Sequence, residues 1–359
     1  MLAAAPITWG VCELPEWGDV PPFDQVLDEM AAAGFAGTEL GPPGFLPAEP
    51  GRLRQALDAR GLALVGAFCP VMLHRAVETA ASLESGVALA RLLAALGCPL
   101  LVAADAGDAR RRAVAGRVTP GAGLTDDEWA RLGDGLADLA RRCAPLGVRV
   151  VFHPHAGTYV ETEVEVDRLM AAVPADQVGL CLDTGHLAYG GADPVEVCRR
   201  YAARVWHVHA KDVRADVLAR VRDERLDYAT AVGLGVFAPL GDGALDFPAL
   251  VGTLRDAGYR GWYVLEQDVR LGPPWPPQVP AANARRSAQY LRELLQPPSP
   301  SSHARGVGSE DSRGPAAGVP PLLAGEGSVD RRGPAVGAPL SAPERGQAAR
   351  SSRRPNNEP

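Results

Sequence analysis

Three side chains that can bind metal or move protons occupy alternate positions in the stretch VWHVHAKDVR. They are His207, His209 and Lys211. Because side chains alternate across a β-strand with a period of two, all three share one face if this stretch is extended. Lys211 is also the single lysine among 36 lysines and arginines. A lysine is compact and rotatable, and its pKa can fall on burial, whereas a guanidinium is planar and always charged. Position 211 is therefore expected to be unsuited to arginine.

Further ionisable residues follow other short apolar runs. His153 and His155 again alternate, and Asp183 ends the run VGLCLD. The remaining members of this set are Glu39, His186, Glu266 and Asp268. Imidazole and carboxylate groups that converge form a mixed nitrogen and oxygen site, which suits Mn, Co, Fe or Zn. The set predicts a divalent metal site or an acid-base site.

Structural roles remain open for some of these residues. Asp183 can cap the segment that follows it, and Glu39 can pair with a neighbouring arginine. Trp9, beside the first predicted strand, can be a core aromatic or a wall of the pocket that binds substrate.

The elements that must position these residues alternate regularly over residues 1–296. Apolar runs predict eight strands, at 6–10, 37–40, 62–68, 99–104, 148–155, 178–183, 205–212 and 262–268. Amphipathic patterns, most of them closed by glycine, predict helices at 23–34, 52–61, 83–97, 126–147, 163–173, 193–203, 246–258 and 281–295. This size and order predict an α/β fold, a (β/α)8 TIM barrel. A doubly wound sheet is less favoured because no glycine-rich phosphate turn follows the first strand.

In such a barrel the active site lies at the carboxyl ends of the strands, where the ionisable set is found. The stretch 215–243, after the seventh strand, is expected to form a helix and a loop over the mouth of the barrel and to select the substrate.

Composition limits the partners and the location. The net charge of -7 argues against nucleic acid. No signal peptide and no membrane span is recognisable, and six cysteines lie far apart without a CxxC pair, so we expect a cytoplasmic protein with reduced thiols and no membrane contact. Residues 297–359 are rich in proline, glycine and arginine, and we expect a disordered low-complexity tail without a role in the chemistry.

Several strings in residues 5–295 resemble the xylose-isomerase-like sugar isomerase and epimerase superfamily. They are PITWG, AGFAGTELGPPGFLP, HPHAGTYVET, CLDTGHLAYGGADP, HVHAKDVR, GVFAPLGDGALDF and GWYVLEQD. Within the superfamily they look most like the inosose dehydratases, which dehydrate 2-keto-myo-inositol in inositol breakdown. The combination of HPHAGT, DTGH and HxHxKD is fairly specific, whereas each motif alone is weak.

The resemblance implies one divalent metal, with Mn or Co expected, held by residues of strands five to eight. Asp183, His209 and Glu266 match the last three ligand positions. At the first position many isomerases have a glutamate, and this chain has His153, with His155 two residues on. Histidines there agree with the dehydratase branch. We expect His153 to bind the metal and His155 to face the substrate, although either can be the ligand.

The implied reaction removes a proton beside the ketone, passes through an enediolate and expels a hydroxyl group. We expect Glu266 or His155 to be the base, His186 or His207 to help donate the proton to the leaving hydroxyl, and Lys211 to hydrogen-bond the developing oxyanion.

Trp9, Glu39 and Asp268 are expected to contact the substrate, a small polyol or sugar ketone. Two alternatives remain, a keto-sugar isomerase or epimerase with the same metal chemistry, and a sugar-binding barrel without activity. A homo-oligomer is also possible.

Overall fold

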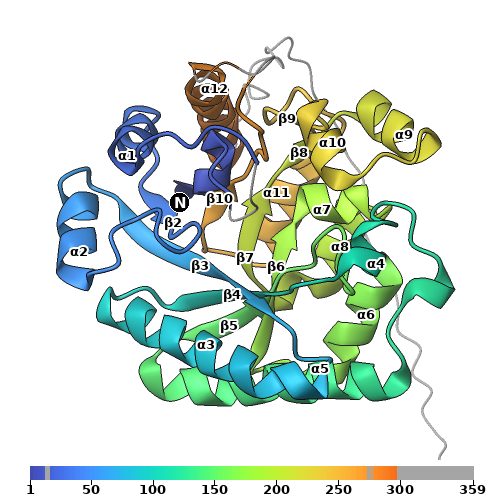
Figure 1. The fold of residues 1–359 in the computed structure, drawn as a ribbon. Coiled ribbons are helices and arrows are strands. Elements are labelled where there is room, and N and C mark those ends of the chain that lie inside the picture. Colours follow the sequence, from blue (N-terminus) through green and yellow to red (C-terminus); the bar gives the residue numbers. More distant parts are fainter. Residues whose placement is uncertain (13–16, 273–275, 277, 297–359) are drawn as a thin grey trace, which may run out of the picture. The chain divides into compact units, whose positions relative to one another are not determined.

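The computed structural model describes residues 1–12, 17–272, 276 and 278–296. The predicted disordered tail, 297–359, lies outside the described residues. Within the described part, the strands close into one parallel barrel that helices surround (Figure 1). The predicted (β/α)8 barrel is therefore confirmed.

The barrel strands follow one another around the ring in chain order. They are β1 (Leu2–Ala4), β2 (Gly37–Glu39), β3 (Ala63–Val71), β4 (Leu100–Asp105), β5 (Arg149–Phe152), β6 (Val178–Asp183), β7 (Val205–Ala210) and β10 (Tyr263–Leu265). The ring closes because β1 pairs in parallel with both β2 and β10. Parallel strands all end at the same rim, so residues that follow different strands gather there.

The helices lie near their predicted positions. The longer ones are α1 (Phe23–Ala32), α2 (Pro50–Asp58), α3 (Ala76–Ala95), α5 (Asp126–Cys143), α6 (Glu163–Ala172), α8 (Pro194–Tyr201), α11 (Phe247–Asp256) and α12 (Gln278–Leu295). Local sequence fixes several of their starts. Thr125 and Glu128 form a capping box at α5, and Thr162 and Glu165 form another at α6. None of the helices in the described part is long and apolar enough to cross a membrane.

The first strand was predicted in the wrong place. The string PITWG, residues 6–10, is a short 3-10 helix (Pro6–Trp9) instead of a strand, and β1 precedes it. Pro6 starts the turn, where its missing N–H costs nothing, and Gly10 ends it in the left-handed conformation with φ of 78°. The apolar residues of this string therefore belong to a turn that packs into the core.

Shorter elements form a cover at the carboxyl rim between β7 and α11. They are β8 (Asp212–Val213), α9 (Ala215–Asp223), α10 (Tyr228–Gly233) and β9 (Phe237–Ala238). Two further short helices lie outside this segment: α4 (Ala109–Arg112) follows β4, and α7 (Thr184–Tyr189) follows β6. β8 and β9 pair antiparallel, and α9 and α10 lie beside them (Figure 1). This agrees with the helix and loop predicted for residues 215–243.

Candidate metal and acid-base site

The predicted site residues do gather at the carboxyl rim. Asp183, the last residue of β6, pairs in register with His209 of β7. Glu266 follows β10, and its backbone N–H donates to the carbonyl of Ala210. The alternation predicted for β7 places the rings of His207 and His209 5.2 Å apart. Neighbouring parallel strands therefore bring together residues that are far apart in the sequence.

Asp183 and His209 each lie close to further metal-type side chains. His209 Nδ1 lies 3.4 Å from Glu266 Oε1 and 3.6 Å from Asp183 Oδ2. His153 Nε2 lies 3.2 Å from Asp183 Oδ2. Among the described residues, the Nδ1 atoms of His153 and His209 are buried and form no hydrogen bond.

Buried nitrogen atoms without partners, beside two carboxylates, are what a metal site requires. The ligand atoms of His153, Asp183 and His209 lie within 4.8 Å of one another. The residues present therefore fit a divalent metal.

The electrostatics of this set also favour positive charge. Burial raises the pKa of Glu266, with its neighbours Asp183 and Asp268 adding to the effect of burial. Burial acts against the charged form of His209, but nearby groups, Glu266 among them, outweigh it and hold the pKa of His209 well above its usual value. A cation at this point relieves the repulsion between the carboxylates.

Lys211 lies at the centre of the acidic residues. Its Nζ is 2.8 Å from Asp268 Oδ1, 2.9 Å from Glu266 Oε2 and 3.4 Å from Asp183 Oδ2. Burial lowers the pKa of Lys211, but these three carboxylates outweigh burial and raise it above its usual value. Lys211 is a charged, fully buried ammonium.

We expect arginine to fit poorly at this position. The aliphatic stem of Lys211 lies directly against Gly185, where any Cβ would collide with it. Lys211 Nζ also donates to His186 Nε2 at 2.9 Å and lies 5.1 Å from the centre of the Phe237 ring. A guanidinium is broader than an ammonium and needs more room in this enclosure.

His155 and His186 form a stacked pair, with ring centres 3.7 Å apart. Burial, with the charges of His153 and Lys211, lowers the pKa of His155 to about 3. Burial also holds the pKa of His186 well below its usual value. Both rings are therefore neutral at neutral pH. His155 is partly exposed, and its Nδ1 bonds the carbonyl of Ala156 at 2.9 Å, which leaves Nε2 as a proton acceptor.

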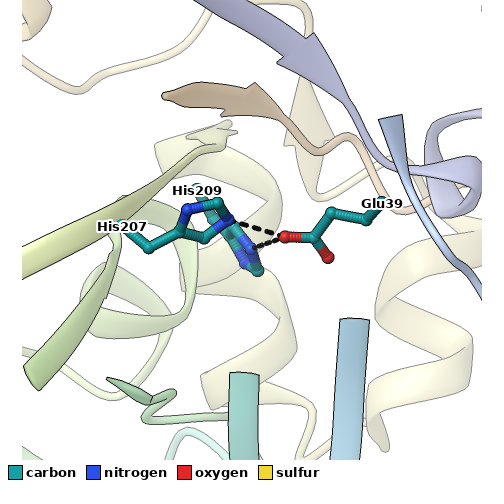
Figure 2. Close-up of side chains that lie close together, drawn as sticks. All are labelled: Glu39, His207 and His209. Carbon is teal, nitrogen blue, oxygen red and sulfur yellow. Dashed lines mark hydrogen bonds and ion pairs between the residues drawn. The ribbon is translucent and has the colours of Figure 1, made fainter. Parts of the chain in front are cut away.

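Two residues expected to contact the substrate, Trp9 and Glu39, are buried and bond other side chains of the chain. The indole N–H of Trp9 donates to Glu29 Oε2 of α1 at 2.7 Å, and its ring packs in the main core. Of the two interpretations of Trp9, the structure supports the core aromatic. Glu39 is buried beneath the rim and bonds His207 and His209, so its partners are histidines and not the neighbouring arginine considered from the sequence (Figure 2). His207 points toward Glu39 (Figure 2).

The sequence interpretation missed Tyr228, the first residue of α10. Its hydroxyl donates to Asp268 Oδ2 at 2.5 Å. Its ring stacks 5.9 Å from that of His186 and 6.5 Å from that of Trp17. The cover predicted over the mouth was the available signal, but no spacing rule points from Tyr228 to Asp268, which lies 40 residues further along the chain.

Comparisons with known proteins agree with this architecture. The family model described as xylose isomerase-like TIM barrel matches residues 27–294. The chain is 42% identical over 267 residues to the rhizopine catabolism protein MocC of Rhizobium meliloti, covering 74% of this chain and 81% of that protein. It is 40% identical over 300 residues to inosose dehydratase of Geobacillus kaustophilus, covering 82% of this chain and 94% of the relative.

Solved structures resemble the barrel more distantly. The IOLI protein with a binding zinc atom superposes with a TM-score of 0.59 at 17% identity, covering 82% of this chain and 97% of that one. An L-ribulose 3-epimerase superposes with a TM-score of 0.58, also at 17% identity, covering 82% and 94%. These likenesses show the fold.

Proposed function

We propose that this chain, which belongs to the xylose isomerase-like TIM barrel family, is a hydro-lyase that removes water from inosose in inositol catabolism. The observation that carries the proposal is the 40% identity to an inosose dehydratase over 94% of that enzyme's length. The buried group formed by Asp183, His209, Glu266 and Lys211 supplies the chemistry that such a reaction needs.

The proposed metal ligands are His153, Asp183, His209 and Glu266, and Mn or Co is the proposed metal. A divalent metal bound there would polarise the substrate ketone and stabilise negative charge on its oxygen. The nitrogen and oxygen donors suit these ions. His153 is the preferred histidine of its pair because its Nε2 already lies 3.2 Å from Asp183 Oδ2, whereas Nδ1 of His155 bonds the carbonyl of Ala156.

His155 is the proposed base that removes the proton beside the ketone. It is neutral, partly exposed, and has Nε2 free to accept a proton. Glu266, the alternative base, is engaged by His209 and Lys211 and is better placed as a ligand. A positioned base contributes roughly 100-fold to 10,000-fold to the rate.

Lys211 and His186 are proposed to stabilise the developing oxyanion and to protonate the departing hydroxyl. The ammonium of Lys211 donates to His186 Nε2, so the two share one hydrogen-bonded path. Lys211 stabilises negative charge that develops on the substrate oxygen, and its ammonium supplies the proton that His186 would pass to the departing hydroxyl. His207 is not preferred for this step because its Nε2 is occupied by Glu39.

The cover selects the substrate in this proposal. Asp268 holds the ammonium of Lys211 through Oδ1 and the hydroxyl of Tyr228 through Oδ2. A carboxylate in this position can accept hydrogen bonds from the ring hydroxyls of a polyol. Tyr228 and Trp17 form the adjacent apolar wall.

The test is turnover of inosose by the purified protein supplied with Mn²⁺ or Co²⁺. We expect the absorbance of a new dione and a product lighter by one water. A product of unchanged mass would indicate the isomerase or epimerase alternative, and binding without turnover would indicate a sugar-binding barrel. Either result, with correctly folded and metal-loaded protein, contradicts the proposal.

A further inference from the structure

A second group of metal-type side chains shares His209 with the proposed metal ligands. Glu39 Oε1 is 2.7 Å from His207 Nε2 and 2.9 Å from His209 Nε2, and Figure 2 shows both rings turned toward the same carboxylate oxygen. All three residues are buried, with at most 3% of their surface exposed. Glu39 comes from β2, which β1 and β10 separate from β7 in the ring.

This trio is better explained by hydrogen bonds than by a metal ion of its own. The candidate ligand atoms lie within 4.8 Å of one another. However, metal-ligand bonds of about 2.0–2.2 Å keep tetrahedral ligand atoms more than about 3 Å apart. The two contacts to Glu39 are shorter than this and have the length of charge-assisted hydrogen bonds.

The direction of these bonds fixes the proton on His209. An ionised carboxylate can only accept, so His209 must donate through Nε2. A histidine that binds a metal is a neutral imidazole with one proton, so metal binding through Nδ1 requires that proton to stay on Nε2. This Nδ1 atom is the one that faces Glu266 at 3.4 Å and Asp183 at 3.6 Å.

The packing around Glu39 holds its carboxylate in this position. Gly66 of β3 lies beside it, and a Cβ on Gly66 would be 3.1 Å from Glu39 Oε1. His207 bonds the same oxygen from a second direction. Gly66 therefore leaves space for the carboxylate of Glu39, and His207 and His209 hold it as two hydrogen-bond donors.

We propose that Glu39 is a positioning residue that orients His209 for metal binding through Nδ1, with His207 fixing Glu39 in turn. The inference rests on the metal site of the proposed function. Outer partners that orient a metal-binding histidine commonly contribute 10-fold to 100-fold to metal affinity.

The test compares two variants of Glu39 by metal affinity. Glu39→Met removes the acceptor at similar size, and we expect the metal-free protein to bind Mn²⁺ or Co²⁺ about 10-fold to 100-fold more weakly in a chelator competition. Glu39→Gln keeps an acceptor oxygen and is expected to recover most of the affinity. Unchanged affinity in Glu39→Met overturns the proposal, as does an equal loss in both variants.

A matched control and a second variant separate positioning from stability. Asp105 is another buried carboxylate that bonds a histidine, His74, at 2.8 Å, and its other bonds go to Gly107 and Tyr159. Asp105→Asn should destabilise the fold without weakening metal binding. If Glu39→Met does not fold, Gly66→Ala displaces the same carboxylate, and we expect a similar loss of affinity.

Metal stoichiometry and turnover supply the remaining outcomes. We expect one ion per chain, and two ions would mean that the Glu39 trio binds metal itself, which overturns the positioning role. If metal affinity responds to Glu39 as expected but inosose is not dehydrated, the proposed function fails and the positioning role stands. If inosose is dehydrated and Glu39→Met binds metal normally, the proposed function stands and the positioning role fails.

Discussion

The ammonium nitrogen of Lys211 lies 2.9 Å from Glu266 Oε2, while Glu266 Oε1 lies 3.4 Å from Nδ1 of His209. Glu266 thus connects the single lysine of the chain to the histidine proposed as metal ligand. The carboxylate of Glu266 therefore contacts both His209 and the ammonium of Lys211. A change in the shape or charge of either neighbour must therefore affect the other.

Lys211→Arg should abolish most of the activity. The ammonium of Lys211 lies 2.9 Å from Glu266 Oε2, and we expect the broader guanidinium to displace this carboxylate. We expect kcat/KM on inosose to fall at least about 100-fold, the scale of one lost acid-base group. Arg220→Lys, which exchanges the same two cations on an exposed face of α9, is the control and should keep full activity. Full activity in Lys211→Arg would remove Lys211 from the mechanism.

Asp183→Asn should prevent metal-dependent turnover and leave the barrel folded. Asparagine can still accept the backbone N–H of His186 at the start of α7, so the cap survives while the negative charge is lost. Chelator treatment of the wild type should give the same loss, reversed by Mn²⁺ or Co²⁺. Circular dichroism and metal analysis accompany the assay. Wild-type protein that stays fully active after verified removal of metal would contradict this prediction.

Tyr228→Phe should weaken substrate selection more than catalysis. The variant loses the hydroxyl that bonds Asp268 Oδ2 and keeps the ring over His186. One lost hydrogen bond to a charged group corresponds to about 1.5–3 kcal/mol, so we expect KM to rise about 10-fold or more with a smaller change in kcat. Tyr201→Phe, which loses a similar bond to Asp167 outside the site, is the control. Equal kinetics for both variants would show that Tyr228 does not select substrate.

Stability should fall in acid partly through Asp108. Burial raises the pKa of Asp108, but the backbone N–H of Arg111, the hydroxyl of Tyr159 and the charge of Arg75 outweigh burial and lower it below the ordinary 3.8. A lowered folded-state pKa stabilises the fold above the unfolded value, and this stabilisation is lost as the pH falls through the folded value.

Asp108→Asn keeps the cap of α4 and removes the charge. The wild type should exceed it by about 1 kcal/mol in free energy of unfolding near pH 7, the scale of one partly exposed ion pair, and the difference should disappear well below pH 3.8. Denaturant unfolding of both proteins at several pH values measures this. A difference that grows in acid would contradict the sign of the pKa shift.

Local pattern was enough to predict most of the barrel. The apolar runs at 178–183 and 205–212 became β6 and β7, because buried parallel strands need continuous apolar residues whatever surrounds them. The cap signals of α5 and α6 act within four residues and are visible in the sequence. The first strand was misplaced because β1, Leu2–Ala4, is too short to show any period, while the neighbouring Pro6–Trp9 turn is equally apolar.

The sequence by itself determined which residue types reach the carboxyl rim. Alternation along β7 placed His207, His209 and Lys211 on one side of the strand, and strand order placed Asp183 and Glu266 beside them. Only the tertiary structure decided what each of these residues contacts. Closure of the ring brings Glu39 of β2 across to the histidines of β7, the cover brings Tyr228 onto Asp268, and Trp9 turns outward to Glu29. These contacts depend on which strands and loops meet when the barrel closes. The spacing of residues along one strand carries no information about the distance between residues of different strands.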